Sequence, residues 1–242
     1  MKGVILAGGL GSRLSPMTRV TNKHLLPIYD RPMIYYPLRS LVDAGLRDIL
    51  LVTGGNNAGD FLRLLGNGQE FGLKRLHYAY QEGEGGIADA LALAEAFAEG
   101  EPLCVILGDN ILQHSIRRHV ETYAEKGSGG MILLKEVPDP ERFGVPTLKG
   151  GKIVAIHEKP KQPASRYAVI GVYMYDARVF EIIHGLAPSE RGELEITDVN
   201  NRYLAWGELA HDVIDGWWTD AGTVESLYRA AMLVAEERKA GR

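Results

Sequence analysis

Leu6-Ala7-Gly8-Gly9-Leu10-Gly11-Ser12-Arg13 places a glycine-rich turn directly after an apolar run. The apolar run, Val4–Ala7, is typical of a buried strand. The glycines permit positive φ angles and let backbone N–H groups approach a phosphate without a Cβ in the way. This pattern predicts a phosphate-binding loop at the carboxyl end of a strand.

Known phosphate motifs fit this loop poorly. A P-loop would end in Gly-Lys-Ser/Thr, which is missing. A dinucleotide fingerprint would begin at Gly9, but its third glycine position is Leu14, and Pro16 soon interrupts a helix. Asp30, at a suitable distance for a ribose contact, lies in a segment that resembles a turn. A glycine turn without any ligand remains an alternative from the loop alone.

Two basic residues favour the phosphate interpretation. Arg13 closes the loop, and Lys23 follows within a segment bounded by Pro16 and Pro27. The prolines predict an extended loop more than a helix there. Lys23 therefore lies in a loop that returns toward the strand ends, although a surface lysine is usually just a solvated charge.

Short apolar runs alternate with segments of helical periodicity over the first 135 residues. This alternation predicts a mostly parallel sheet with helices on both faces. Ligands of such sheets bind beyond the carboxyl ends of the strands. The segments expected there are Gly8–Arg13, Gly54–Asn57 and Gly108–Asn110. The expected strands of this half are Val4–Ala7, Asp48–Thr53, Arg75–Tyr80, Leu103–Leu107 and Met131–Val137, and the expected helices lie at 34–42, 61–65, 87–97 and after Ser115.

The second half changes character. Lys149-Gly150-Gly151 predicts a hairpin between Val145–Leu148 and Lys152–Glu158. Further strands are expected at Tyr167–Tyr175 and Leu209–Ile214, and helices at Asp176–His184, Glu195–Leu204 and near the C-terminus. We expect one continuous domain over residues 1–242, with a first part at about 1–135, an inserted substrate-binding part at about 136–222 and a helix at 223–240.

Composition excludes several classes of protein. The chain has 45% hydrophobic and 24% charged residues, as ordered globular proteins do. Its net charge of −4 argues against a general nucleic-acid binder. The single cysteine, Cys104, permits no intrachain disulfide, and no apolar run approaches the roughly 20 residues of a membrane span. We therefore expect a soluble, cytoplasmic protein without a membrane partner.

Several blocks of the chain, in order, resemble the sugar nucleotidyltransferases. The N-terminal glycine motif is followed by Lys23-His24-Leu25-Leu26-Pro27 and by Pro32-Met33-Ile34-Tyr35-Tyr36-Pro37-Leu38. Later blocks are Leu107–Asn110, Asp139–Val145, Glu158–Pro160, Gly192–Asn200 and Asp220–Thr223. The resemblance covers essentially the whole chain. It implies a Rossmann-like three-layer α/β/α sandwich around a mostly parallel mixed sheet, with a nucleotide-binding part at about 1–135 and a sugar-binding part at about 136–222.

The resemblance also implies an activity: Mg²⁺-assisted in-line attack of a sugar 1-phosphate on the α-phosphorus of a nucleoside triphosphate, with release of pyrophosphate. The first expectation is dTTP and glucose 1-phosphate, giving dTDP-glucose. The alternatives are UTP or another sugar 1-phosphate and, in a different class, an inactive sugar-nucleotide-binding regulatory protein. A homo-oligomer is compatible with the sequence. Because both reactants are anions, positioning and charge neutralisation should carry most of the rate.

Residue roles implied by the resemblance fall into four groups. The catalytic group is Arg13, Lys23 and Asp109. The nucleotide-binding group is Leu6, Gly8, Gly9, Gly11, Ser12, Arg13, Lys23, His24, Gln81, Gly86 and Asp109. The sugar-phosphate group is Asn110, Gly144, Glu158, Lys159, Gly171 and Glu193. Asp109 and Asp220 are the expected Mg²⁺ ligands.

The chain departs from the family pattern at several points. His24 stands where many dTTP-using members have glutamine, so thymine over uracil is not settled by sequence. The segment Gln81–Gly86 lacks the usual proline and carries Glu82 and Glu84, and Asp89 replaces a common glutamine. The chain ends at Arg242, where longer members continue into regulatory helices, so we expect a short form without that regulatory site. Trp217 and Trp218 are candidates for core packing or for lining the sugar pocket.

Overall fold

The computed structural model describes residues 1–55 and 57–240. Position 56, in the segment Gly54–Asn57, and positions 241–242 lie outside the described residues. The chain divides into two compact units. The glycine-loop unit comprises Gly3–Glu84, Ile106–Arg117 and Gly216–Arg242, and the hairpin unit comprises Met1–Lys2, Gly85–Val105 and Arg118–Asp215.

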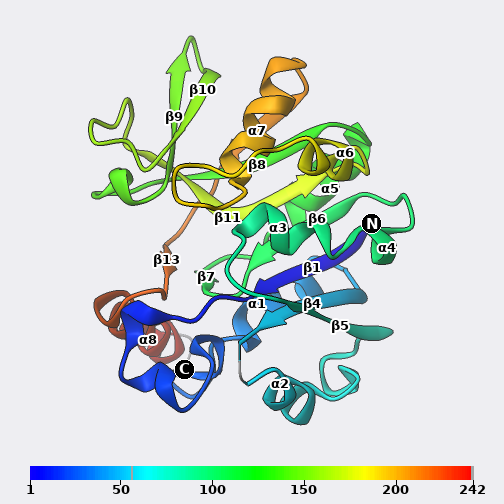
Figure 1. The fold of residues 1–242 in the computed structure, drawn as a ribbon. Helices are drawn as coiled ribbons and strands as arrows, with labels where there is room; N and C mark the ends of the chain where they lie inside the picture. Colours follow the sequence, from blue (N-terminus) through cyan, green and yellow to red (C-terminus); the bar gives the residue numbers. More distant parts are fainter. Residues whose placement is uncertain (56, 241–242) are drawn as a thin grey trace. The chain divides into compact units, whose positions relative to one another are not determined.

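Parallel strands form the centre of the glycine-loop unit (Figure 1). β1 (Lys2–Ala7) pairs with β4 (Asp48–Gly54), which pairs with β5 (Arg75–Gln81). β6 (Leu103–Leu107) ends in this unit, where Gly108 N–H donates to Leu6 O at 2.8 Å. The apolar runs that predicted β1, β4 and β6 are buried, whereas β5 is buried mainly at Leu76 and Gln81. Because the strands are parallel, their carboxyl ends and the loops that follow lie at one edge.

Helices α1 (Tyr35–Asp43) and α2 (Ala58–Leu65) join these strands. The predicted extended loop between the glycines and Pro27 instead contains three short 3₁₀ turns, η1 (Ser12–Leu14), η2 (Met17–Arg19) and η3 (Lys23–Leu25). The proline-bounded segment therefore folds compactly without a full helix. It continues into a small hairpin, β2 (Pro27–Ile28) and β3 (Arg31–Pro32), whose turn contains Asp30 as expected.

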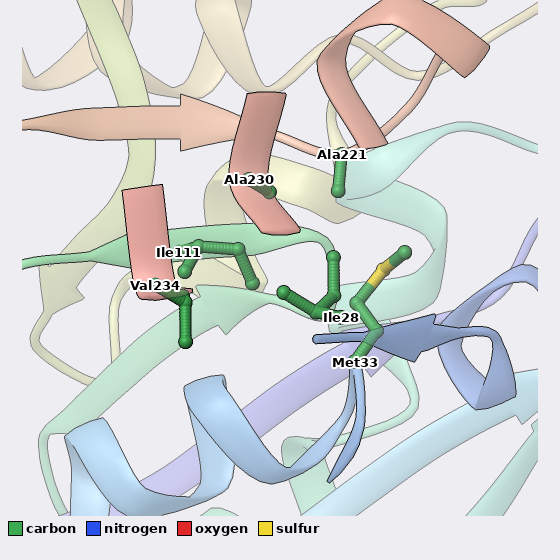
Figure 2. Packing of buried hydrophobic residues seen from close by; sticks show 6 residues of the cluster. All are labelled: Ile28, Met33, Ile111, Ala221, Ala230 and Val234. Atoms are coloured by element: carbon green, nitrogen blue, oxygen red, sulfur yellow. The ribbon is translucent and has the colours of Figure 1, made fainter. Parts of the chain in front are cut away.

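The C-terminal segments of the glycine-loop unit share an apolar cluster (Figure 2). They are β7 (Asn110–Leu112), β13 (Trp218–Asp220) and α8 (Val224–Ala240). The cluster consists of Ile28, Met33, Ile111, Ala221, Ala230 and Val234. Trp217 packs against it, as the core-packing interpretation predicted. This cluster anchors the segments that carry Asp109 and Asp220.

The hairpin unit contains the predicted second-half strands (Figure 1). β11 (Tyr167–Tyr175) pairs antiparallel with β8 (Gly130–Glu136), and β12 (Leu209–Val213) runs parallel to β8. β9 (Gly144–Lys149) and β10 (Lys152–Glu158) form the hairpin predicted at Gly150-Gly151. The helices of the hairpin unit are α3 (Ile87–Ala92), α4 (Glu95–Ala98), α5 (Arg117–Lys126, whose first residue belongs to the glycine-loop unit), α6 (Val179–His184) and α7 (Ile196–Ala205), and it also contains the 3₁₀ turn η5 (Pro140–Arg142). The 3₁₀ turn η4 (Gln69–Phe71) lies in the glycine-loop unit.

Two helices differ from the sequence-based expectation. The single helix expected at 87–97 is two short helices, α3 and α4. The helix expected from Asp176 begins at Val179, because the Asp176 carboxylate accepts hydrogen bonds from the backbone N–H groups of Gly129 and Arg178. Aspartate competes in this way for backbone donors at helix starts. Ser115 behaves as predicted, since its Oγ accepts from Arg117 N–H at 3.2 Å.

Candidate active site

A buried ion pair lies beyond the ends of the parallel strands. Lys23 Nζ donates to Asp109 Oδ2 at 2.7 Å, and the two side chains are only 15% and 14% exposed. Burial by itself would raise the pKa of Asp109, but the Lys23 ammonium outweighs it and holds that pKa well below its ordinary value. Asp109 is therefore a carboxylate at neutral pH, as the predicted roles of both residues require.

Arg13 and Asp220 converge on the same place. A Cβ built on Gly222 would lie 3.3 Å from Arg13 Nη2, 3.3 Å from Asp220 Oδ2 and 3.6 Å from Asp109 Oδ2. Two aspartates far apart in sequence thus point their oxygens at one small region, beside two cationic side chains. We refer to Arg13, Lys23, Asp109 and Asp220 as the charge cluster.

Backbone and side-chain contacts tie the two aspartates together. Asp220 pairs with Asn110 in the antiparallel β7–β13 ladder, and Ala221 N–H donates to Asp109 O at 2.9 Å. Asn110 Nδ2 donates to Asp109 Oδ1 at 3.1 Å, and Trp218 Nε1 donates to Asn110 Oδ1 at 2.8 Å. Asn110, predicted as a sugar-phosphate residue, is thus buried and bonded beside Asp109.

The glycine loop lies against Lys23. Gly11 has φ of +63°, and a Cβ there would meet Lys23 Cβ at 3.0 Å and Thr18 Cγ2 at 2.9 Å. Gly9 has φ of +88°, with nothing within 4 Å of its missing Cβ. Backbone N–H groups that follow one another through such a turn can form a concave site that suits an anion. Ser12 begins the 3₁₀ turn η1 directly after this loop.

An acidic side chain already contacts this loop. Leu10 N–H, between the two positive-φ glycines, donates to Glu84 Oε1 at 3.1 Å. Glu84 comes from the segment that departs from the family pattern, so sequence reasoning noted the residue without predicting this contact. A carboxylate on a glycine-loop N–H occupies the kind of position that a phosphate oxygen would take.

Gln81 and His24 are buried side chains close to the glycine loop. Gln81 is buried at the end of β5, and its Oε1 would lie 2.6 Å from a Cβ on Gly8. His24 is 1% exposed, with its ring next to Gly108 and its Nδ1 2.8 Å from Asn22 Oδ1. The same Asn22 atom accepts from the backbone N–H of His24, so it is the amide oxygen. An amide oxygen can only accept, and Nδ1 is therefore the ring nitrogen that carries a proton. Burial, helped by Lys23, lowers the pKa of His24 to about 3, so the ring is neutral at neutral pH.

The hairpin unit holds a second polar group of side chains. Glu158 Oε2 accepts from Thr197 Oγ1 at 2.6 Å, next to Gly144, where a Cβ would lie 3.3 Å from that hydroxyl. Lys159, which has a positive φ of 42°, places Nζ 3.5 Å from Glu158 Oε1. This group unites Gly144, Glu158 and Lys159, which were predicted to bind the sugar phosphate.

Arg191 is a residue that sequence reasoning missed. Its guanidinium makes a paired contact with Glu195 at 2.7 Å and lies 3.3 Å from Glu193 and 3.6 Å from Glu158. The hydrogen bonds that Arg191 donates to Glu195, and then the charges of the neighbouring carboxylates, raise the pKa of Arg191 further above its ordinary value. The run of charged residues around Gly192 was the available signal, but it did not reveal which carboxylates Arg191 would join.

The remaining predicted residues also lie in described elements. Gly86 has φ of +96° and packs against Leu194 and Glu193, with a Cβ position only 2.7 Å from Leu194 O. Gly171 lies in the middle of β11. Leu6 uses its backbone carbonyl in the sheet. Within the described residues, the structure therefore groups Gly144, Glu158, Lys159, Gly86 and Glu193 in the hairpin unit and the charge cluster in the other.

The oxygen atoms of the charge cluster form a donor set that fits a divalent cation. Within residues 1–55 and 57–240 no group of three or more His, Cys, Asp or Glu side chains could hold a metal alone. Mg²⁺ does not require one, since it is commonly held by one or two carboxylates together with substrate phosphates. The oxygens of Asp109 and Asp220 around Gly222 suit that mode. Among the described residues, no helix is long and apolar enough to span a membrane.

Known proteins match almost the whole length of this chain. A family model described as nucleotidyl transferase matches residues 2–237. A glucose-1-phosphate thymidylyltransferase from Neisseria gonorrhoeae is 47% identical over 238 residues, covering 97% of this chain and 82% of the relative. One from an Actinoplanes species is 46% identical over 233 residues, covering 95% of this chain and 77% of the relative.

A solved structure gives the same fold. A Bacillus anthracis protein crystallised in complex with a sucrose superposes with a TM-score of 0.92 at 52% identity, covering 96% of this chain and 94% of that one. The predicted fold class, a mostly parallel mixed sheet with helices on both sides, is confirmed.

Proposed function

Because the chain belongs to the nucleotidyl transferase family, we propose that it condenses dTTP with glucose 1-phosphate to give dTDP-glucose and pyrophosphate. The relatives that match nearly the whole chain carry the name glucose-1-phosphate thymidylyltransferase. The observation that supports the catalytic assignment is the charge cluster, in which Arg13, Asp109 and Asp220 surround Gly222. We further propose that residues 1–242 act as one cytoplasmic nucleotidyltransferase domain.

The glycine loop receives the triphosphate. Backbone N–H groups of Gly8–Ser12 cradle its oxygens, and Arg13 and Lys23 neutralise charge that builds up as the α-phosphorus is attacked. Because Lys23 is held against Gly11, its ammonium is preorganised with little motion required. Gln81 and Gly86 contact the nucleobase, and His24 supports the loop from below as a neutral ring.

Asp109 and Asp220 are the residues that would hold Mg²⁺. A Mg²⁺ ion held there would supply positive charge against the phosphates and would help to orient the triphosphate. Lys23 shares Asp109 Oδ2, so it limits the negative charge that the two carboxylates present to the substrate. Asn110 keeps the other oxygen of Asp109 in place.

The sugar phosphate is assigned to the hairpin unit. Glu158 and Glu193 accept hydrogen bonds from sugar hydroxyls, and Gly144 and Gly171 lie beside the sugar ring. Lys159 binds the phosphate. The phosphate monoester is itself the nucleophile, so no side chain has to remove a proton from it. The bond from its oxygen to the α-phosphorus forms as the bond to pyrophosphate breaks.

The test is pyrophosphate release with Mg²⁺, measured for dTTP and UTP against a panel of sugar 1-phosphates. The expected result is the highest kcat/KM for dTTP with glucose 1-phosphate. A higher value for UTP or for another sugar would select the alternative substrate pair. Nucleotide binding without turnover for any pair would contradict the enzyme assignment and favour a regulatory sugar-nucleotide binder.

The metal assignment makes a separate prediction. Asp109→Asn and Asp220→Asn should each lower kcat by about 100-fold or more, because each removes a carboxylate charge from the metal position. Circular dichroism and thermal melting monitor the fold. Asp212→Asn, an exposed carboxylate of the hairpin unit, is the control and should retain activity. Near-normal turnover in either charge-cluster variant would remove that residue from the metal site.

A further inference from the structure

The indole of Trp218 lies at the start of a chain of hydrogen bonds that ends in the charge cluster. Trp218 Nε1 donates to Asn110 Oδ1 at 2.8 Å, and Asn110 Nδ2 donates to Asp109 Oδ1 at 3.1 Å. Asp109 Oδ2 then accepts from Lys23 Nζ at 2.7 Å. Trp218, Asn110 and Asp109 thus form a chain, which we name the indole relay.

The chemistry of these groups gives the indole relay a direction. The carboxamide of an asparagine can flip by 180°, which exchanges the positions of its oxygen and nitrogen, and a carboxylate rotates easily about its last torsion. An indole N–H can only donate, so the group facing it must be the Asn110 oxygen. That choice forces Nδ2 toward Asp109. With the amide reversed, two oxygens would face each other at Asp109.

The backbone connects the same residues to the other aspartate. Trp218 and Asp220 are two residues apart on β13, so their side chains lie on the same face of the strand. Asp220 is the ladder partner of Asn110. Asn110 is 2% exposed, so solvent gives its amide little compensation for a lost partner. A change at Trp218 should therefore be felt at both carboxylates of the metal position.

We propose that Trp218 is a positioning residue that orients the Asp109 carboxylate through Asn110, so that Asp109 and Asp220 present their oxygens to one divalent cation. Trp218 itself touches neither the cation nor the reacting phosphates in this role. The inference rests on the proposed function, because it assigns the two aspartates to a metal.

The first test is Trp218→Phe, which keeps an aromatic ring and removes the N–H donor. Mn²⁺ binding in the presence of dTTP, followed by electron paramagnetic resonance, should weaken about 10-fold, the order found for groups that orient metal ligands. kcat should fall by a similar factor, while the KM for glucose 1-phosphate changes little. The matched control is Trp206→Phe in the hairpin unit, which should leave both measurements unchanged.

A double-mutant cycle tests the route through Asn110. In an Asn110→Ala background, Trp218→Phe should have little further effect on Mn²⁺ binding, because the link is already broken. The same additional loss in both backgrounds would overturn the relay. Equal Mn²⁺ affinity in wild type and Trp218→Phe would also overturn it, even if turnover fell.

A measurement on the unmutated residue covers the case in which Trp218→Phe fails to fold. The three indole N–H resonances can be assigned by elimination with Trp206→Phe and Trp217→Phe. The Trp218 N–H should exchange slowly with solvent and shift when Mg²⁺ and dTTP are added. Exchange at the rate of a free indole, or no shift, would contradict the proposal. A wild type that binds Mn²⁺ normally but turns over no substrate would instead reject the proposed function.

Discussion

Lys23 and Asp109 illustrate how single residues acquire their properties from burial. A carboxylate taken out of water is destabilised, but the ammonium at 2.7 Å compensates, and the pKa of Asp109 falls below its ordinary value. The pair thereby supplies stability that is present above the ordinary aspartate pKa near 4 and is lost as the pH falls below it. The site is thus charged throughout the neutral range.

His24 makes a prediction about pH. Burial and Lys23 lower its pKa to about 3, against about 6.5 in an unfolded chain. The unfolded state therefore binds the proton more readily, so this residue contributes full stability above about pH 6.5 and loses it as the pH falls toward 3. His24→Gln should flatten the dependence of the free energy of unfolding on pH between 6.5 and 4.

Urea denaturation at several pH values measures this dependence, with His184→Gln, at an exposed position, as the control. If His24→Gln left the slope of the free energy of unfolding against pH unchanged, His24 would take up its proton as readily in the folded protein as in the unfolded chain. The same variant should alter the dTTP:UTP ratio of kcat/KM if position 24 influences base recognition. An unchanged ratio would assign His24 to support of the loop alone.

Glu84 leads to a prediction about nucleotide affinity. Its carboxylate accepts from Leu10 N–H in the glycine loop, so a triphosphate that uses this N–H must displace it. Glu84→Gln removes a negative charge that competes with phosphate and should lower the KM for dTTP about 3- to 10-fold, which corresponds to roughly 1 kcal/mol, the net contribution of one hydrogen bond. Glu82→Gln, two positions away and exposed, is the matched control. Equal effects of both variants would indicate only a general charge effect.

At the scale of elements, the glycine loop is shaped by contacts as well as by φ. Ala at Gly9 has to adopt a positive φ but meets no atom, whereas Ala at Gly11 also meets Lys23 and Thr18. Backbone strain alone costs about 1–3 kcal/mol. We expect Gly9→Ala to lose stability within that range and to keep Lys23 in place.

Gly11→Ala should lose more stability than Gly9→Ala and should also reduce kcat, because relief of the clash moves Lys23 away from Asp109. Thermal melting and steady-state kinetics of the two variants separate strain from displacement. If both alanines lowered kcat equally, the position of Lys23 would not depend on its contact with Gly11.

At the scale of the whole molecule, ligand binding should be visible as stability. A ligand present at 100 times its Kd stabilises a folded protein by about 2.7 kcal/mol. For a chain of this size each kcal/mol raises Tm by about 2–4 °C, so dTTP with Mg²⁺ should raise Tm by roughly 5–10 °C. Addition of EDTA should remove most of the increase. A rise that survives EDTA would mean that nucleotide affinity does not depend on a divalent cation.

The sequence by itself determined the longer strands, the hairpin at Gly150-Gly151 and the glycine loop, but not the short strands β2, β3, β7 and β13. These features depend on periodicity, chain direction and local φ preference, which act over a few residues. The departures were also local: Asp176 took backbone donors from the start of its helix, and 3₁₀ turns formed between the two prolines.

Only the tertiary structure decided which of these residues meet. Asp109 and Asp220, Trp218 and Asn110, Arg191 and Glu158, and Glu84 and Leu10 are distant pairs whose contacts depend on strand register and on the packing of whole elements. Sequence patterns carry no information on such distances, because burial and hydrogen-bond partners are set by the complete fold. The ordering of charge around Gly222 is therefore a property of the packed unit and not of any one motif.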